Sequence, residues 1–241
     1  MNNIDLNTIT KLSICTCRSR SFIAPRQVAQ LAAEAEAAGC QVELIADLCE
    51  ACEENAPLLN ELGDVVAACH PRAVKSLLEW RGVAVPQLID LRALSTLNSQ
   101  PSTLNSQPST LDRWLERVNE LPQHLGSDAW YPTMDKSQCA ECGKCLEFCP
   151  FGVYEMVDDR VRVAHPHQCK NNCPACARIC PANAVIFPKY ERSPINGGEA
   201  QEEQAVRTDI SSLYTDELRR RLQQRRAMGV GLFKGEKEIR G

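Results

Sequence analysis

The sequence of 241 residues contains no apolar run that approaches the 18 residues needed to span a membrane. Residues 1–10 are polar and lack the apolar core of a secretory signal, so we expect no signal peptide and a cytoplasmic location. The net charge of −4 argues against nucleic acid as the main partner. No G-x-G-x-x-G motif follows a predicted strand, so we expect neither a flavin nor a nicotinamide site.

Cysteine, in contrast, is abundant, with 14 residues in the chain. In a reducing compartment clustered cysteines bind metal rather than one another, so we interpret them as ligands and not as disulfide partners. Eight of them form two runs that each end in Cys-Pro: Cys139-x2-Cys142-x2-Cys145-x3-Cys149-Pro150 and Cys169-x3-Cys173-x2-Cys176-x3-Cys180-Pro181.

The spacing within these runs indicates the kind of metal centre. Three thiols within seven residues suit an iron–sulfur cube, whereas structural zinc prefers paired C-x2-C arms separated by a longer loop. The spacing Cys169-x3-Cys173-x2-Cys176 also occurs in radical S-adenosylmethionine enzymes. Only 65 residues follow Cys176, too few for the barrel of roughly 200 residues that those enzymes need. Replacement of a thiolate by His165 or His167 is a further alternative.

The two runs, together with Pro150 and Pro181, resemble those of the bacterial dicluster ferredoxins over about residues 131–190. In that family the fourth cysteine of each run ligates the other cluster. The resemblance implies an α+β ferredoxin-like domain with two [4Fe-4S] clusters, although the second run has one residue more than usual after Cys169. The implied ligands are Cys139, Cys142, Cys145 and Cys180 for the first cluster, and Cys169, Cys173, Cys176 and Cys149 for the second.

Short strands are predicted around the two runs. Residues 153–157 and 160–163 indicate a β-hairpin that turns at Asp158-Asp159. Residues 184–187, after the second run, predict a matching short strand.

Residues 11 to about 94 predict a separate α/β domain in which strands and helices alternate. This βαβαβα pattern favours a small parallel sheet covered by helices. Residues 65–68 are apolar throughout, so we expect that strand to be buried on both faces. Strands are predicted at 11–14, 42–46, 65–68 and 88–89, with helices beginning at Pro25 and Pro71 and another marked by Leu58, Leu59 and Leu62.

Five cysteines follow the predicted strands. Because the carboxyl ends of parallel strands share one edge of a sheet, where ligands bind, these thiols are expected to come together. Cys40 follows a helix instead, so we expect it at the opposite edge, structural or inert. The five are Cys15, Cys17, Cys49, Cys52 and Cys69.

The segments 14–17, 47–50 and 66–72 resemble the N-terminal domain of the heterodisulfide reductase A subunit, over about residues 10–85. The chain departs from that protein by lacking its flavin module. Cysteines that merely fill the core, and a redox-active pair at Cys49-x2-Cys52, remain alternatives. His70 is expected to cap a helix or to donate a hydrogen bond to a ligand. The resemblance implies a third [4Fe-4S] cluster on Cys15, Cys17, Cys49 and Cys69, with Cys52 as the alternate ligand.

The remaining segments are polar. Residues 95–112 repeat the sequence TLNSQPS and predict a flexible linker, followed by a connecting helix within 113–130. Residues 191–241 predict a polar tail with a basic helix from about Thr215. That helix is either simply solvated or a docking element for an acidic partner.

These features predict an iron–sulfur electron-transfer protein whose cysteines act as ligands rather than as nucleophiles. We expect a subunit or adaptor of a larger oxidoreductase from an anaerobic host, with redox proteins as donor and acceptor. Two other classes remain open. One is a heterodisulfide- or thiol-reductase-like enzyme that uses the N-terminal cysteines, and the other is a module that senses redox state or assembles clusters.

Overall fold

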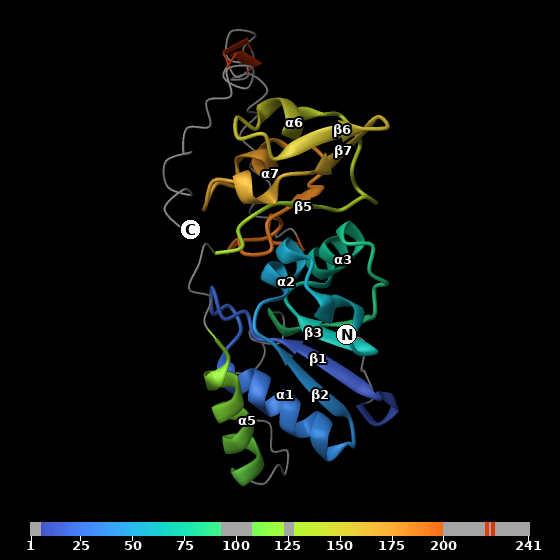
Figure 1. Ribbon diagram of the computed structural model, residues 1–241, viewed down its shortest axis with the longest axis vertical. Coiled ribbons are helices and arrows are strands. Elements are labelled where there is room, and N and C mark those ends of the chain that lie inside the picture. The colour runs from blue at the N-terminus through green and yellow to red at the C-terminus, as the bar shows by residue number, and fades with distance from the viewer. Residues whose placement is uncertain (1–5, 93–107, 123–127, 200–219, 222, 225–241) are drawn as a thin grey trace. The chain divides into compact units, whose positions relative to one another are not determined.

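The computed structural model describes residues 6–92, 108–122, 128–199, 220–221 and 223–224. The chain divides into two compact units, Met1–Ala129 and Trp130–Gly241 (Figure 1). No helix within the described ranges is long and apolar enough to cross a membrane.

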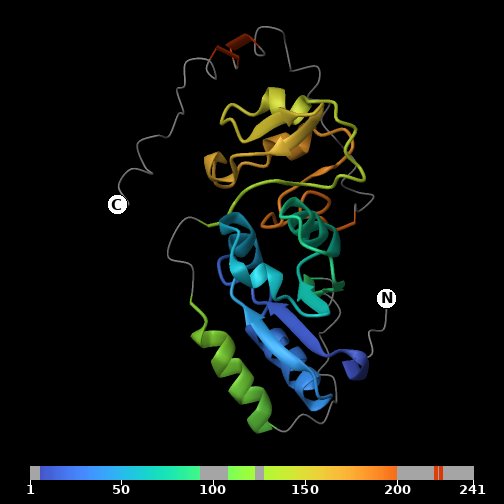
Figure 2. The same cartoon turned by 45° about the vertical axis from the view of Figure 1, so that its right-hand side comes forward.

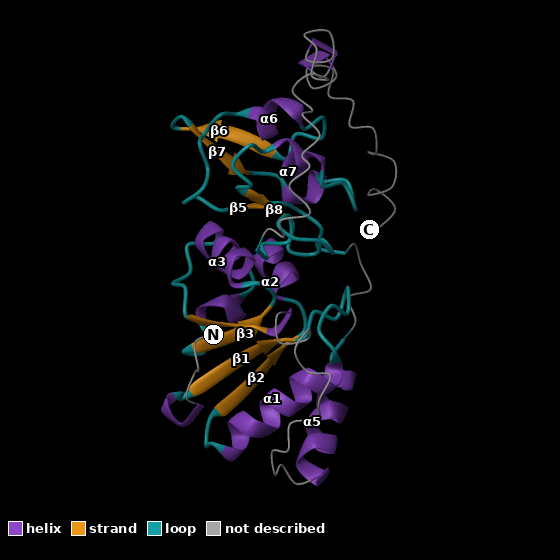
Figure 3. Cartoon of the chain, turned by 180° about the vertical axis from the view of Figure 1, so that it is seen from behind, coloured by secondary structure: helices purple, strands orange, loops and turns teal. Residues whose placement is uncertain are grey.

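The first unit is built on a four-stranded parallel sheet, which confirms the predicted α/β architecture (Figure 3). The chain enters at the inner strand β1, adds β2 on one side and then crosses to the other side. The border between β1 and β3 is therefore a topological switch point, and ligands bind at the carboxyl edge of such points. In spatial order the strands are β2 (Gln41–Ile45), β1 (Lys11–Cys15), β3 (Val65–Ala68) and β4 (Gln87–Asp90).

Apolar residues of the two inner strands form the core of this unit. Leu12 and Ile14 of β1 are fully buried, and all four residues of β3 are buried, as the sequence predicted. Helix α1 (Pro25–Ala37) contributes Val28 and several alanines, whose small side chains allow the helix to lie close to its neighbours.

Helix α5 (Pro108–Glu120) packs against α1 (Figure 3). The Trp114 Nε1–H donates to Glu36 Oε2 at 2.8 Å, and Arg113 pairs with the same carboxylate. These contacts lower the pKa of Glu36, chiefly through the hydrogen bond from Trp114. The helix begins inside the stretch 95–112 that was interpreted as linker, and residues 93–107 lie outside the described part of the chain.

The second helix was predicted to begin at Cys49 and Cys52, as it does, but its predicted extension through Leu58, Leu59 and Leu62 is wrong. Leu58 and Leu59 lie in a short 3₁₀ turn, η2 (Pro57–Asn60), and helix α2 spans only Leu48–Glu54. The side chain of Asp47 caps its N-terminus, and Asn55 ends it with a left-handed φ of 53°. Helix α3 (Pro71–Trp80) begins at a first-turn proline as predicted, and a 3₁₀ turn, η1 (Leu6–Thr8), precedes β1.

The second unit has two halves of similar design (Figure 2). Each half contains a cysteine loop that runs into a short helix, and the two helices pack against each other. The first and last strands of the unit pair antiparallel, and so do the two strands between the cysteine runs. The elements are β5 (Thr133–Met134), α6 (Lys144–Phe148), β6 (Tyr154–Val157), β7 (Arg160–Val163), η3 (Pro166–Gln168), α7 (Ala175–Ile179) and β8 (Val185–Ile186).

The predicted hairpin between the halves is confirmed. Strands β6 and β7 pair antiparallel, with Val157 opposite Arg160. Asp158 and Asp159 both have positive φ, of 50° and 57°, as a two-residue type I′ turn requires.

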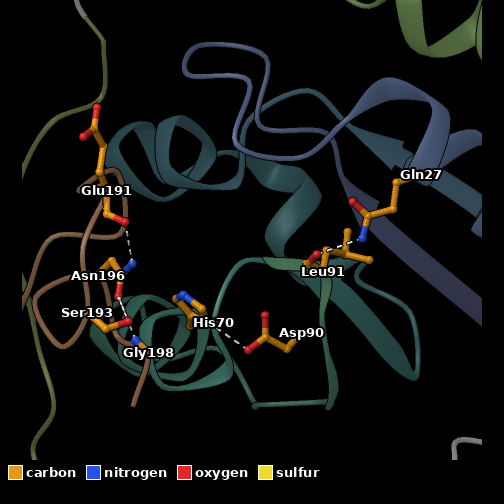
Figure 4. A network of polar contacts seen from close by, with 8 residues as sticks. All are labelled: Gln27, His70, Asp90, Leu91, Glu191, Ser193, Asn196 and Gly198. Atoms are coloured by element: carbon orange, nitrogen blue, oxygen red, sulfur yellow. Dashed lines mark hydrogen bonds and ion pairs between the residues drawn. The ribbon is translucent and has the colours of Figure 1, made fainter. Parts of the chain in front are cut away.

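Residues 191–198, predicted to belong to the polar tail, form ordered turns around the buried side chain of Asn196 (Figure 4). Asn196 Oδ1 accepts hydrogen bonds from Ser193 Oγ (3.1 Å) and the Gly198 N–H (2.9 Å), and Nδ2 donates to the Glu191 carbonyl (3.3 Å). These bonds satisfy the buried amide, so the segment is ordered despite its composition. Of the predicted basic helix, only 220–221 and 223–224 lie within the described residues, and all four are helical and exposed.

Gly63 is required for close packing at the amino edge of the parallel sheet. A Cβ at this residue would lie 2.3 Å from the backbone oxygen of Lys11. We expect Gly63→Ala to lower the free energy of unfolding by about 1–3 kcal/mol in urea titrations, because the backbone must move. The control is Gly39→Asn. At Gly39, where φ is +85°, a Cβ would have no neighbour within 4 Å, and asparagine tolerates this backbone conformation. Equal effects of the two substitutions would contradict this account.

Candidate metal centre

The cysteines of the second unit occupy equivalent places in its two halves. Each run begins in an exposed loop, sends its third cysteine into a short helix, and ends with the fourth cysteine as the C-cap of that helix. Cys142 is exposed and Cys139, Cys169 and Cys173 are partly exposed, whereas the third and fourth cysteines of both runs are buried. The buried four are Cys145, Cys149, Cys176 and Cys180.

The fourth cysteines have nearly the same backbone conformation. Cys149 has φ −71° and ψ 111°, and Cys180 has φ −70° and ψ 112°. The prolines that follow them favour this extended conformation and disfavour continuation of the helix. Each Cys-Pro pair thus ends its helix and directs the next strand away from the cysteine loop.

The loops also share a left-handed residue directly before the second cysteine. Glu141 precedes Cys142 with φ 49°, and Asn172 precedes Cys173 with φ 61°. The extra residue of the second run therefore lies between Cys169 and Asn172, and the backbone next to Cys173 keeps the geometry of the first run.

Electrostatic coupling joins the fourth cysteine of the second run to the first run. The pKa of Cys145 is raised to about 12, first by burial and then by the charges of Cys180, Cys139 and Cys142. Burial also raises the pKa of Cys139; the backbone hydrogen bond from Glu141 opposes this shift, while the charges of Glu141 and Cys180 add to it. The fold therefore brings Cys180 close to cysteines about 40 residues earlier in the chain.

The reciprocal coupling joins Cys149 to the second run. Burial is the main cause of the raised pKa of Cys176, and the charges of Cys149, Cys145 and Cys173 add to it. The hydroxyl of Tyr154 donates to Cys176 Sγ at 3.1 Å. The Cys169 Sγ lies 3.8 Å from the carbonyl oxygen of Lys170.

The chemistry of this donor set fits iron–sulfur clusters. Buried thiols that raise one another's pKa stay protonated by themselves, whereas cationic iron would stabilise all of them as thiolates. Among the described residues no three His, Cys, Asp or Glu side chains gather as a site for a single metal ion. A cube spreads its four thiolates over four irons, so its ligands lie further apart than those of one ion.

In the first unit the five predicted cysteines follow the carboxyl ends of three strands. Cys15 ends β1 and Cys17 follows with φ 50°; Cys49 and Cys52 lie on α2 after β2; Cys69 follows β3. All are buried except Cys69, which is partly exposed. Cys40 precedes β2 at the opposite edge, as predicted, and its thiol donates to the carbonyls of Leu6 and Ile9.

Three of these thiols interact directly. Burial raises the pKa of Cys15 well above its ordinary value, and the charges of Cys17, Asp47 and Cys69 contribute. Burial raises the pKa of Cys69 to about 12, with Cys17 the largest electrostatic cause. The group lies at the switch point, because β1 and β3 are neighbours.

Cys52 differs from the other four. Its side chain is fully buried, and burial raises its pKa to about 12, opposed by Arg81 and supported by Asp47. A redox-active thiol pair needs a lowered pKa, so this environment weighs against a nucleophilic Cys49–Cys52 pair.

Asp47 is a component of this site that the sequence interpretation did not identify. Its carboxylate is 5% exposed and accepts hydrogen bonds from the N–H groups of Cys49 and Glu50 and from Ser19 Oγ. Its charge acts on Cys15, Cys52 and Cys69. The available signal was an aspartate directly before the helix that begins beside Cys49.

His70 and His165 each lie beside a carboxylate. His70 occupies the N-cap position of α3 without a side-chain capping bond, and its Nδ1 lies 2.9 Å from Asp90 Oδ2 (Figure 4). Gln27 Nε2 donates to the carbonyl of Leu91, which anchors the residues after β4. His165 Nε2 lies 2.8 Å from Glu155 Oε1.

Comparisons with known proteins show that the second unit is similar to ferredoxins. A family model described as a 4Fe-4S dicluster domain matches residues 131–207. An uncharacterized ferredoxin of Methanocaldococcus jannaschii is 46% identical over 61 residues, which are 25% of this chain and 42% of that protein. Ferredoxin-3 of Nostoc sp. is 34% identical over 89 residues, 28% of this chain and 91% of that protein. The thiosulfate reductase electron transfer subunit of Salmonella typhi is 32% identical over 91 residues, 34% of this chain and 47% of that protein.

The chain thus spans less than half of the Methanocaldococcus and Salmonella relatives but nearly all of the Nostoc ferredoxin. The match covers the two cysteine runs and the hairpin between them, which are the elements that form the candidate centre. The chain therefore belongs to the ferredoxin family with a 4Fe-4S dicluster domain, which it carries in residues 131–207.

Proposed function

We propose that this protein is an electron-transfer component of a larger oxidoreductase, with two [4Fe-4S] clusters in its second unit. The observation that carries the proposal is the coupling of Cys180 to Cys139 and Cys145, with the reciprocal coupling of Cys149 to Cys176. It supports ligand sets that exchange their fourth members. The first set is Cys139, Cys142, Cys145 and Cys180; the second is Cys169, Cys173, Cys176 and Cys149.

Each cluster, when bound, accepts and releases single electrons. The chain itself contributes the surroundings that permit this. Its buried cysteines keep water away from one side of each ligand set, while the partly exposed Cys139, Cys142, Cys169 and Cys173 leave the other side close to the surface. Electrons can therefore enter and leave at the loops without a large conformational change.

A role within a complex is supported by the relatives. One of them is named as the electron transfer subunit of a thiosulfate reductase. The first unit of this chain carries a further group of clustered thiols. A ferredoxin that acts as an independent electron carrier would not need such an additional unit. We propose redox proteins as donor and acceptor, and a cytoplasmic, anaerobic setting in which exposed clusters survive.

We further propose that the first unit holds a third [4Fe-4S] cluster, as its resemblance to the heterodisulfide reductase subunit implies. Coupling among Cys15, Cys17 and Cys69 at the switch point supports this site. Cys49 is the proposed fourth ligand. The environment of Cys52 sets it apart from the group, because its pKa responds to Arg81 and Asp47.

Iron and acid-labile sulfide in anaerobically purified protein test the ligand sets of the second unit. Cys180→Ala is expected to lower the iron content by about four atoms per chain, because one cube loses a ligand from a distant run. Cys40→Ala, which removes another buried thiol, is the control and keeps the wild-type content. An undiminished iron content in Cys180→Ala would contradict the exchange of fourth ligands.

The third cluster has a separate test. Wild-type protein is expected to contain about twelve irons, and Cys69→Ala or Cys49→Ala about eight. Cys52→Ala should keep about twelve. A wild-type content of about eight would remove the third cluster and leave the proposal for the second unit intact.

Two substitutions of Asp47 can separate its role as the cap of α2 from the effect of its negative charge on the nearby cysteines. Asp47→Ala should destabilise the first unit by about 1 kcal/mol in urea titrations, since the cap of α2 is lost. Asp47→Asn keeps an oxygen acceptor but removes the negative charge near Cys15 and Cys69. It should retain most of the stability and raise the reduction potential of the third cluster in anaerobic redox titrations. A potential unchanged in Asp47→Asn would mean that the carboxylate is only a cap.

A further inference from the structure

Tyr154 connects the two halves of the ferredoxin unit. It is the first residue of β6, five residues after Cys149, and its side chain is 4% exposed. Its hydroxyl donates to the Sγ of Cys176, which lies on α7 in the other half. A buried phenol usually finds a hydrogen-bond partner, and here that partner is a thiol sulfur of the second ligand set.

Cysteines of both ligand sets surround this hydroxyl. Cys176 and Cys149 of the second set and Cys145 of the first act on it electrostatically, and burial together with their charges keeps the phenol protonated. A tyrosine hydroxyl has one proton to donate. The structure directs that proton to Cys176, so only the second set receives it.

The equivalent position of the other half has no such donor. Val185 begins β8, five residues after Cys180, as Tyr154 begins β6 five residues after Cys149. Its side chain is buried and purely apolar. The duplicated design therefore differs at this position: the Tyr154 hydroxyl donates to Cys176, whereas the Val185 side chain has no group that can donate a hydrogen bond.

Resting on the proposed function, we propose that Tyr154 is a positioning residue that raises the reduction potential of the cluster held by Cys169, Cys173, Cys176 and Cys149 relative to that of the first. A hydrogen bond donated to a ligand sulfur stabilises the reduced form, because that form carries the additional negative charge. The electron is thereby biased toward the second cluster.

The test is an anaerobic redox titration of the full-length Tyr154→Phe protein, followed by electron paramagnetic resonance. The ring remains and only the hydroxyl is lost. We expect one potential to fall so that the ratio of oxidised to reduced cluster changes about tenfold at a fixed potential, or ~59 mV for a one-electron centre. The other potential should stay near its wild-type value. Paramagnetically shifted cysteine proton signals, linked to the ring of residue 154 by nuclear Overhauser contacts, identify the affected cluster.

The control is Tyr190→Phe. The Tyr190 hydroxyl accepts a hydrogen bond from Arg178 Nη2 at 3.2 Å, so its removal should leave both potentials unchanged. Replacement of all tyrosines by 3-fluorotyrosine keeps the fold and gives a stronger donor, so in the wild-type protein it should raise the same potential and leave the other unchanged. This second measurement decides the matter if the phenylalanine variant fails to assemble its clusters.

Unchanged potentials in Tyr154→Phe, or equal shifts of both potentials, would overturn the inference about Tyr154. The proposed function would still stand if the protein contained about eight or more irons per chain. A wild-type chain without iron would overturn the proposed function and the inference with it.

Discussion

The constraint on which this structure depends is the burial of several ionisable thiols at a short distance from one another. Burial and, after it, the neighbouring thiols together raise the pKa of Cys145 to about 12. Such a group is costly if it is charged and adds little to the core if it is neutral. Iron resolves the conflict, because it supplies the positive charge that allows all the sulfurs to be thiolates at once.

The two units meet this constraint with different folds. The ferredoxin unit uses duplication: a loop, a short helix and a Cys-Pro pair occur twice, and the fourth cysteine of each run caps the C-terminus of its helix. The first unit uses the edge of a parallel sheet, where β1 and β3 bring Cys15, Cys17 and Cys69 together. In the ferredoxin unit the grouped cysteines are mostly close in sequence, whereas in the first unit the cysteines follow three separate strands.

Duplication makes the differences between the halves informative. The helix caps agree within a degree or two, so the backbone offers both ligand sets a similar frame. Tyr154 and Val185 occupy the same place in that frame and differ in hydrogen-bonding capacity. Asp47 has a comparable position in the first unit, since one carboxylate both caps α2 and sets the local charge. A few polar side chains thus give groups of cysteines with the same ligand type different hydrogen bonds and different local charge.

Local sequence was sufficient for much of this protein. The hairpin turn at Asp158-Asp159, the helices that begin at Pro25 and Pro71, and the fully apolar strand β3 all follow from short-range preferences, and the Cys-Pro runs indicate clusters by spacing alone. The extension of the second helix to Leu58 was wrong because an aspartate cap and a following proline outweighed the leucine spacing. What only the tertiary structure decided were the contacts between distant segments: Cys180 beside the first run, Tyr154 on Cys176, and Asp47 among the N-terminal thiols. These depend on which elements pack against one another, and no local preference encodes that.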